Sequence, residues 1–390
     1  MKIAFIGQKG IPTKSGGVEK HVEELTTRLA KRGHEVFVYA RNNYSDKNID
    51  IYKGVKIIHL PSISTKHLDA ITHTFLATVH ALFQNYDIVH FQAIGPSSLS
   101  FIIRLFKRKT AVIATHHCQD YYHKKWSAFA RACLKMGEYI TVNFPHKTIA
   151  VSKNLGLYIK TKFKKDAEVI TNGVGVSPVK ETTYLQKWNL QKGGYVLYVG
   201  RFIRHKGVHY LIDAFKNLED KHLTRGKKLV IVGDGFHTDD YVSELKDTAR
   251  GRENIIFTGV RSGEELAQLF SHAYLFVQPS ESEGLSFTLL EAMGYGRAIL
   301  SSDIPENKEP LSASAAIFFK SGDSRDLEEK MVAIINNPDA ARAMGEAAKE
   351  KAEKEYSWDS IVNQIENVYK SVLINKRRFN FKVKLNEKSI

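Results

Sequence analysis

Short apolar strands alternate with helical segments along this chain, and the whole alternation occurs twice. The first series contains expected strands at residues 2–7, 36–40, 55–60, 87–92, 110–115 and 147–151. Strands that are apolar along their whole length are typical of parallel sheets that helices cover on both faces. The first half of the chain therefore predicts an α/β fold built on a doubly wound, Rossmann-like sheet.

The second series begins at 195–200 and predicts a second sheet of the same kind. Its further strands are expected at 229–233, 254–258, 274–278, 298–301 and 315–318. A polar stretch that contains Pro178, Gly193 and Gly194 separates the two series, as linkers between domains commonly do. We therefore expect one domain at 1–180 and another at 181–356. Because ligands bind beyond the carboxyl ends of such strands, two facing sheets are expected to form a cleft.

Basic residues are concentrated in the first half of the sequence. The net charge is +15; residues 1–180 hold 27 Lys and Arg against 12 Asp and Glu, and residues 181–390 hold 30 of each kind. A basic lobe attracts anions, which include nucleic acid, anionic lipid and a phosphorylated acceptor. The charge alone does not distinguish these partners.

The cysteine content and the hydropathy pattern indicate a cellular compartment. Two cysteines, Cys118 and Cys133, are too few for a disulfide framework and are typical of a reducing environment. No apolar run reaches the roughly 18 residues that a membrane span needs. We therefore expect a cytoplasmic protein.

Two glutamates eight positions apart mark the densest motif in the chain. Glu283 lies in a Gly-containing loop after an expected strand, and Glu291 lies in the helix that follows. A carboxylate accepts hydrogen bonds from neighbouring hydroxyls of a ribose or a sugar, and the amides at a helix start bind phosphate. The alternative is an acidic surface loop, placed where the helix dipole favours negative charge.

In each half of the chain, one further loop of interest follows the first expected strand. Arg201 and Lys206 come after the strand at 195–200, where two positive charges can neutralise a diphosphate, although such residues are also common on any surface. Gly16 and Gly17 come after the strand at 2–7, in a loop that matches neither a Walker motif nor a complete Gly-x-Gly-x-x-Gly motif. Because Gly16 and Gly17 have no side chains, the backbone at these positions can approach a ligand closely.

A histidine-rich segment follows another first-half strand and is expected at the same edge of the sheet. It contains His116, His117, Cys118 and Asp120. Zinc binding would require a second pair of ligands at metal spacing, which the sequence does not provide, and a structural histidine is the other alternative. The sequence also contains no Asp-x-Asp motif, which argues against a metal-dependent transferase fold.

Together these motifs resemble the retaining glycosyltransferases of family four, which have the GT-B fold. The resemblance covers nearly the whole chain and implies two facing Rossmann-like domains, with a C-terminal helix at about 357–390 that crosses back to the first domain. It implies that Glu283 lies by the donor sugar and that Glu291 holds the ribose. Arg201 and Lys206 correspond to the family's diphosphate clamp.

The resemblance also implies weaker contacts with both substrates. Further donor contacts are implied at Gly16, Gly17, Val260, Gly284, Leu285 and Ser286. Ser286 stands where the family often has a second glycine, which leaves the donor sugar undefined. Acceptor contacts are implied at His117 and Asp120, and His117 would also touch the transferred sugar.

The implied activity is a retaining, metal-independent transfer of a hexosyl unit from a nucleotide-diphosphate sugar, with UDP as the expected carrier. The expected acceptor is a glycan or a lipid-linked molecule in bacterial cell-surface polysaccharide synthesis, and no cofactor, metal or nucleic acid is expected. The expected catalytic residues are Glu283, Arg201, Lys206 and His117. The alternatives are a nucleotide-sugar epimerase or a glycan phosphorylase on a similar fold, and a basic nucleic-acid-binding protein.

The C-terminal residues add a further basic segment. A helix is expected to end near Val372, and the tail after it contains six cations between Lys376 and Lys388 against one acid, Glu387. Apolar residues alternate with polar ones at 379–385. We expect this tail to help hold the first domain at the anionic inner face of a membrane, and the alternative is a solvated, frayed tail.

Overall fold

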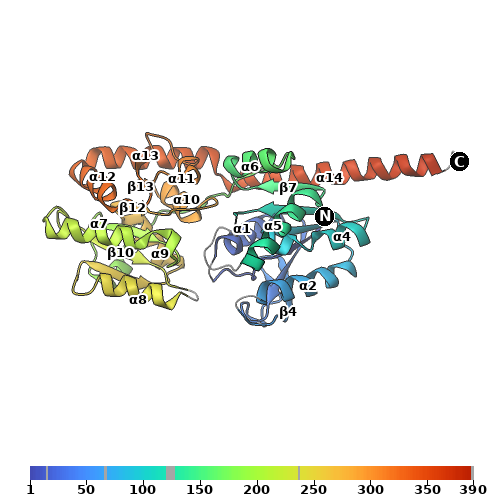
Figure 1. The fold of residues 1–390 in the computed structure, drawn as a ribbon, viewed down its shortest axis with the longest axis horizontal. Helices are drawn as coiled ribbons and strands as arrows, with labels where there is room; N and C mark the ends of the chain where they lie inside the picture. Colours follow the sequence, from blue (N-terminus) through green and yellow to red (C-terminus); the bar gives the residue numbers. More distant parts are fainter. Residues whose placement is uncertain (15, 66–67, 120–127, 236–237, 388–390) are drawn as a thin grey trace. The chain divides into compact units, whose positions relative to one another are not determined.

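The computed structural model describes residues 1–14, 16–65, 68–119, 128–235 and 238–387. These residues form two compact units (Figure 1). Unit 1 comprises Met1–Asn172 and Trp358–Ile390, and unit 2 comprises Gly173–Ser357. The first boundary falls before the expected position at 180, because Val174 already belongs to unit 2: its amide donates to the carbonyl of Tyr356 at 2.7 Å.

Unit 1 is built on an eight-stranded sheet with the order β3-β4-β2-β1-β5-β6-β7-β8. The strands are β1 (Lys2–Ile6), β2 (Glu35–Arg41), β3 (Ile51–Tyr52), β4 (Val55–Leu60), β5 (Ile88–Gln92), β6 (Ala111–His116), β7 (Lys147–Ala150) and β8 (Glu168–Val169). Every pairing is parallel except β3 with β4. The two-residue strands β3 and β8 were not expected, because two residues show no periodicity.

Helices cover both faces of this sheet. They are α1 (Gly17–Lys31), α2 (Asp69–Leu82), α3 (Ile94–Ser97), α4 (Ser100–Phe106), α5 (Ala128–Asn143), α6 (Lys153–Phe163) and α14 (Trp358–Glu387). The connection through α1 runs towards one edge of the sheet, whereas those through α2 to α6 run towards the other. Right-handed crossovers therefore place α1 on one face and α2 to α6 on the opposite face.

Unit 2 is built on a six-stranded, fully parallel sheet with the order β11-β10-β9-β12-β13-β14. Its strands are β9 (Tyr195–Val199), β10 (Lys228–Val232), β11 (Ile255–Gly259), β12 (Leu275–Gln278), β13 (Ala298–Ser302) and β14 (Ile317–Phe319). The two sheets confirm the predicted α/β fold with two doubly wound, Rossmann-like domains.

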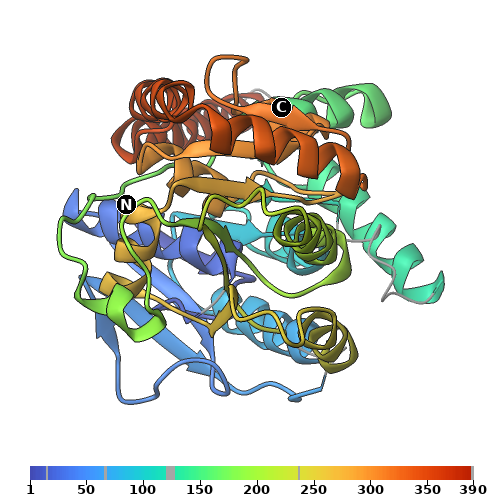
Figure 2. The ribbon, with the colours of Figure 1, turned by 90° about the vertical axis from the view of Figure 1, so that its left-hand side faces the viewer.

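Helices lie on both sides of the unit 2 sheet (Figure 2). They are α7 (Val208–Asp220), α8 (Asp239–Thr248), α9 (Gly263–His272), α10 (Phe287–Gly294), α11 (Pro305–Lys308), α12 (Ser324–Asn336) and α13 (Pro338–Glu355), with 3-10 turns η2 (Thr183–Trp188) and η3 (Arg204–Lys206). Helix α7 packs against α8 and α12, while α10 packs against α13. Strand β9, at the centre of this sheet, has no charged residue and is buried along its whole length.

Helix α14 belongs to unit 1, where it packs against α1. The hydroxyl of Tyr369 and Nδ1 of His90, both buried, are hydrogen-bonded at 2.7 Å. The helix continues to Glu387, close to the end at about 390 that the resemblance implies; the reading of the residues after Val372 as a tail was wrong, and no Gly or Pro interrupts residues 358–387. Burial and the nearby Arg104 charge lower the pKa of Lys376 to about 8, and its ammonium donates to the carbonyl of Thr110 at 2.5 Å.

No helix in the described ranges is long and apolar enough to cross a membrane.

The contact between α14 and β5 predicts the effect of one substitution on stability. Tyr369→Phe leaves Nδ1 of the buried His90 without its partner, so we expect the free energy of unfolding to fall by about 1–3 kcal/mol. Tyr139→Phe is the control, because Tyr139 is 54% exposed. Urea unfolding followed by circular dichroism measures both variants, and equal stability of the two would contradict the proposed role of this contact.

Candidate active site

The carboxyl ends of neighbouring strands bring two distant motifs of unit 2 together. Strand β9 pairs in parallel with β12, so Arg201 and the loop that begins at Pro279 lie at the same edge of the sheet. The amide of Glu281 donates to the carbonyl of His205 at 2.8 Å, which joins the two loops directly. The edge of a doubly wound sheet where ligands bind is therefore the edge that carries both motifs.

A buried ion pair connects these loops. The Lys206 ammonium donates to Oε1 of Glu283 at 2.5 Å, and the two side chains are 16% and 7% exposed. Sequence reasoning assigned Lys206 to the diphosphate and Glu283 to the sugar; in the structure the two side chains bind one another. An anion that reaches Lys206 therefore has to compete with the Glu283 carboxylate for the Lys206 ammonium, or share that ammonium with it.

Two further side chains hold the same carboxylate oxygen. The amide nitrogen of Gln278 and the hydroxyl of Ser280 each donate to Oε1 of Glu283 at 2.7 Å. Gln278 also donates to the Ser280 hydroxyl at 2.8 Å. Sequence reasoning missed both residues, although a polar Gln278 that closes an otherwise apolar strand was a visible signal.

These contacts determine the charge of Glu283. Burial alone raises the pKa of its carboxyl group, but the Lys206 charge, the Lys206 and Ser280 hydrogen bonds and the His205 charge outweigh burial. The pKa of Glu283 therefore lies below its ordinary value, and the group is an anion at neutral pH. It is suited to accept hydrogen bonds and to hold a cation, and it is unsuited to act as a general acid.

A glycine permits the close approach of the two loops. Gly207 has a φ of +69°, and a Cβ atom added there would lie 2.0 Å from the carbonyl oxygen of Pro279. Any side chain at this position would separate η3 from the loop after β12. The spacing of Lys206 and Gly207 thus has a steric reason within the protein itself.

Arg201 is the exposed cation of the site. Its side chain makes no ion pair within the described parts of the chain, whereas Arg204 pairs with Glu244. Arg201 follows β9 directly at the carboxyl edge. Val260, which follows β11 at this edge, is 55% exposed.

The loop after Glu283 leads into α10 through a serine cap. The Ser286 hydroxyl accepts a hydrogen bond from the amide of Leu289 at 3.4 Å, a contact typical of N-cap serines. Leu285 and Ser286 are buried, and Gly284 is half-buried. Glu291 lies on α10. Burial of the phenol, and to a smaller extent the Glu291 charge, raises the pKa of Tyr295 to about 12.

The glycine loop of unit 1 is closed by a glutamate. A Cβ atom on Gly16 would lie 1.9 Å from Oε2 of Glu19, and the amide of Lys9 donates to Oε1 of Glu19 at 3.1 Å. Gly16 has a φ of +110°, and Gly17 begins α1. The backbone conformation at position 16 thus favours glycine, a reason that sequence reasoning missed.

His117 follows β6 in unit 1 and belongs to a buried cluster of histidines. Its Nε2 is hydrogen-bonded to Oε1 of Gln92 at 2.8 Å, and its ring packs edge-on against His21. Burial, followed by the His21, His90 and His116 charges, holds the pKa of His117 well below its ordinary value. The ring is therefore neutral at physiological pH and offers hydrogen bonds rather than charge.

Two expectations on metals and acceptors concern this region. Asp120, the other expected acceptor contact, lies outside the described residues. Among the described residues, no group of three or more His, Cys, Asp or Glu side chains has the arrangement of a metal site. His116 instead pairs with the buried Glu138 at 3.1 Å.

Two family models match successive parts of the chain. The model described as Glycosyltransferase Family 4 matches residues 15–177, and the model described as Glycosyl transferases group 1 matches residues 180–351. Together they account for most of the sequence. The chain therefore belongs to the family-four glycosyltransferases with the GT-B fold.

Individual relatives agree with this membership, and a solved structure agrees with the fold. An uncharacterized glycosyltransferase of Methanocaldococcus jannaschii is 27% identical over 92% of this chain and 95% of its own. The O-antigen chain mannosyltransferase C of Escherichia coli is 24% identical over 96% of this chain and 100% of its own. The structure of Anabaena HepE in complex with UDP-glucose has a TM-score of 0.78 at 19% identity, covering 95% of this chain and 100% of that one. The chain is a glycosyltransferase of glycan or lipid biosynthesis.

The buried ion pair predicts an energetic coupling between its partners. Lys206→Met leaves the Glu283 carboxylate buried without its cation, so we expect the free energy of unfolding to fall by about 3–5 kcal/mol. Adding Glu283→Gln should restore most of this loss. Lys187→Met removes an exposed pair with Glu265 and should cost less than about 1 kcal/mol. A Lys206→Met protein as stable as the wild type in denaturant titration would refute the coupling.

Proposed function

We propose that this chain is a retaining, metal-independent transferase that moves a hexosyl unit from a UDP-sugar to a glycan or lipid-linked acceptor. The observation that carries the proposal is the buried Lys206–Glu283 pair beside the exposed Arg201. Binding of UDP-glucose by the similarly folded HepE supports UDP as the carrier. The similarity to an O-antigen mannosyltransferase supports an acceptor in bacterial cell-surface polysaccharide synthesis.

The proposed reaction breaks the bond between the anomeric carbon and the diphosphate oxygen. The acceptor hydroxyl oxygen forms its bond to the same face of the sugar, and its proton passes to the departing phosphate oxygen. Negative charge grows on the diphosphate during this step, so cations already in position lower the barrier. Arg201 and Lys206 supply that charge, while Glu283 orients Lys206 and accepts hydrogen bonds from the sugar.

The remaining roles follow the same division between the units. Glu291 binds the ribose, the backbone at 284–286 meets the sugar and phosphate, and the base lies near Val260. In unit 1, Gly16 and Gly17 approach the donor, and His117 with Asp120 contacts the acceptor. The neutral state of His117 suits hydrogen bonding to an uncharged hydroxyl.

The rival functions make different demands on substrate. A nucleotide-sugar epimerase converts its donor without an acceptor, whereas a transferase requires one. A nucleic-acid-binding role rests on charge alone: unit 1 holds 33 Lys and Arg against 15 Asp and Glu. We place this charge at the anionic inner face of a membrane, where it would serve a lipid-linked acceptor.

The two glutamates should differ in what they contribute. Glu291→Gln should weaken UDP binding by about 2 kcal/mol, because the ribose hydroxyls lose a charged acceptor. Glu283→Gln should mainly lower kcat, since Glu283 faces the reacting sugar. Calorimetry with UDP and steady-state kinetics measure the two effects. The control is Glu281→Gln, an exposed carboxylate of the same loop, and wild-type values for both site variants would remove the assignment.

The diphosphate should be neutralised by side chains rather than by a metal ion. Arg201→Ala is expected to reduce turnover roughly a hundredfold, as the loss of a group that stabilises transition-state charge does. Wild-type activity should persist in EDTA. Arg204→Ala is the matched control, because Arg204 pairs with Glu244. Activity that EDTA abolishes and Mg²⁺ or Mn²⁺ restores would contradict the metal-free mechanism.

A further inference from the structure

Helix α2 carries its large apolar side chains on the outside. Its buried positions are small or polar, namely His73, Thr74, Ala77, Thr78 and Ala81. Ile71, Phe75 and Leu76 are 40%, 51% and 38% exposed. A surface helix of a water-soluble domain normally buries its apolar stripe and exposes its polar one. The outer surface of α2 is therefore built for an apolar environment.

The same surface continues onto α4. Phe83, directly after α2, is 80% exposed, and Leu105 and Phe106 at the end of α4 are 57% and 76% exposed. The two helix ends are tied together, because the Lys107 ammonium donates to the carbonyl of Leu82 at 2.7 Å and to that of Gln84. We call the exposed side chains of this surface the apolar face: Ile63, Ile71, Phe75, Leu76, Phe83, Leu105 and Phe106.

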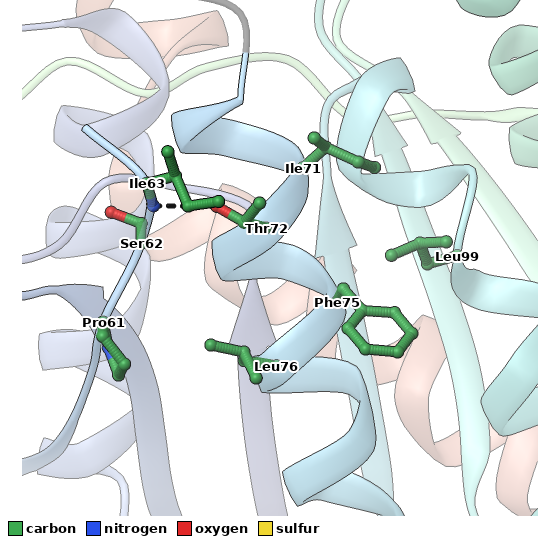
Figure 3. Close-up of a pocket in the computed structure, with 8 residues that line it drawn as sticks. All are labelled: Pro61, Ser62, Ile63, Ile71, Thr72, Phe75, Leu76 and Leu99. Atoms are coloured by element: carbon green, nitrogen blue, oxygen red, sulfur yellow. Dashed lines mark hydrogen bonds between the residues drawn. The ribbon is translucent and has the colours of Figure 1, made fainter. Parts of the chain in front are cut away.

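A hollow of about 590 Å³ opens within the apolar face. Figure 3 shows α2 between the segment that contains Pro61 and Ile63 on one side and Leu99 on the other, with the Phe75 ring towards Leu99. Pro61 follows β4 directly, and Leu99 comes shortly after β5. The hollow therefore lies near the carboxyl edge of the unit 1 sheet, where doubly wound folds bind ligands.

Exposed cations border the apolar face. Arg104, Arg108 and Lys109 are exposed, and residues 99–111 contain four basic residues and no acidic one. Helix α2 contains one acid, Asp69, which is paired with Arg41 at 2.8 Å. Lys376 of α14 lies near enough to Arg104 for the two charges to interact, so the basic C-terminal residues begin beside this border.

The charges beside the apolar face distinguish two candidate occupants, a second copy of the chain and an anionic bilayer. A second copy that packed through the same face around a two-fold axis would bring like cations together, with no acids in the segment to pair them. An anionic bilayer instead offers hydrocarbon to the phenylalanines and negative headgroups to the arginines and lysines.

We propose that the apolar face inserts into the interfacial region of an anionic phospholipid bilayer. Phe75, Phe83 and Phe106 enter the boundary of the acyl chains, and Arg104, Arg108 and Lys109 contact the headgroups. The use of this contact rests on the proposed function: the apolar face runs along α2 from Ile63, near the carboxyl edge of the unit 1 sheet, to Phe83 and Phe106 at the opposite edge, and a lipid-linked acceptor would be taken up at the Ile63 end. The insertion itself requires no donor and no catalysis.

Liposome flotation of the full chain tests the insertion. The wild type should float with vesicles that contain phosphatidylglycerol and much less with pure phosphatidylcholine vesicles. Phe83→Glu with Phe106→Glu should reduce the partition coefficient about tenfold or more, because buried apolar area is replaced by charge. Leu157→Glu with Leu223→Glu is the control, since these leucines are 64% and 38% exposed elsewhere. Arg108→Glu with Lys109→Glu should reduce only the binding that depends on phosphatidylglycerol.

Two companion measurements separate the outcomes. Calorimetry with UDP reports on the donor site. A wild type that floats with anionic vesicles but does not bind UDP would overturn the proposed function and leave the membrane contact standing. Analytical ultracentrifugation without vesicles reports on self-association. A wild-type dimer that the two phenylalanine substitutions dissociate would overturn the membrane proposal, as would a wild type that floats with neither vesicle or a control pair that loses flotation equally.

Discussion

The ion pair between Lys206 and Glu283 is the interaction on which the rest of the unit 2 site depends. It joins the loop after β9 to the loop after β12, and Gly207 allows those loops to approach by leaving room for the carbonyl of Pro279. A buried pair of this kind is costly to desolvate, and Gln278 and Ser280 satisfy the carboxylate oxygen that Lys206 also contacts. The pair holds the Lys206 ammonium near the carboxyl ends of β9 and β12.

The sequence predicted most of the fold because burial imposes a simple pattern on parallel strands. The apolar runs located the long strands of both sheets, and the restart at Tyr195 located the second one. The sequence pattern could not locate the features that depend on contacts between distant residues. Strands β3 and β8 are defined by pairing with their neighbours, and the change of unit at Gly173 follows from contacts between distant parts of the chain, such as the hydrogen bond between Val174 and Tyr356. The resemblance implied a helix to about residue 390, but the residues after Val372 were read as a tail because apolar and polar side chains alternate there.

The candidate site shows the same division. Spacing and residue type selected Arg201, Lys206, Glu283 and Glu291, but they gave no sign that Lys206 and Glu283 bind one another. The supporting residues Gln278 and Ser280 are recognisable only once β9 and β12 are adjacent. In unit 1, the charge count suggested a membrane contact through the basic tail, whereas the apolar face of α2 became visible only when its small and polar residues were found buried. Helical periodicity alone does not say which side of a helix meets the core.

The proposed function requires that a bound diphosphate replace Glu283 as the ion-pair partner of Lys206. A crystal structure of the chain with UDP, prepared without divalent metal, tests it most directly. We expect phosphate oxygens within hydrogen-bonding distance of Arg201 and Lys206, ribose hydroxyls on Glu291, and a Lys206–Glu283 separation longer than the 2.5 Å described above. UDP bound away from these side chains, or a pair that keeps its distance while the phosphates contact other groups, would contradict it.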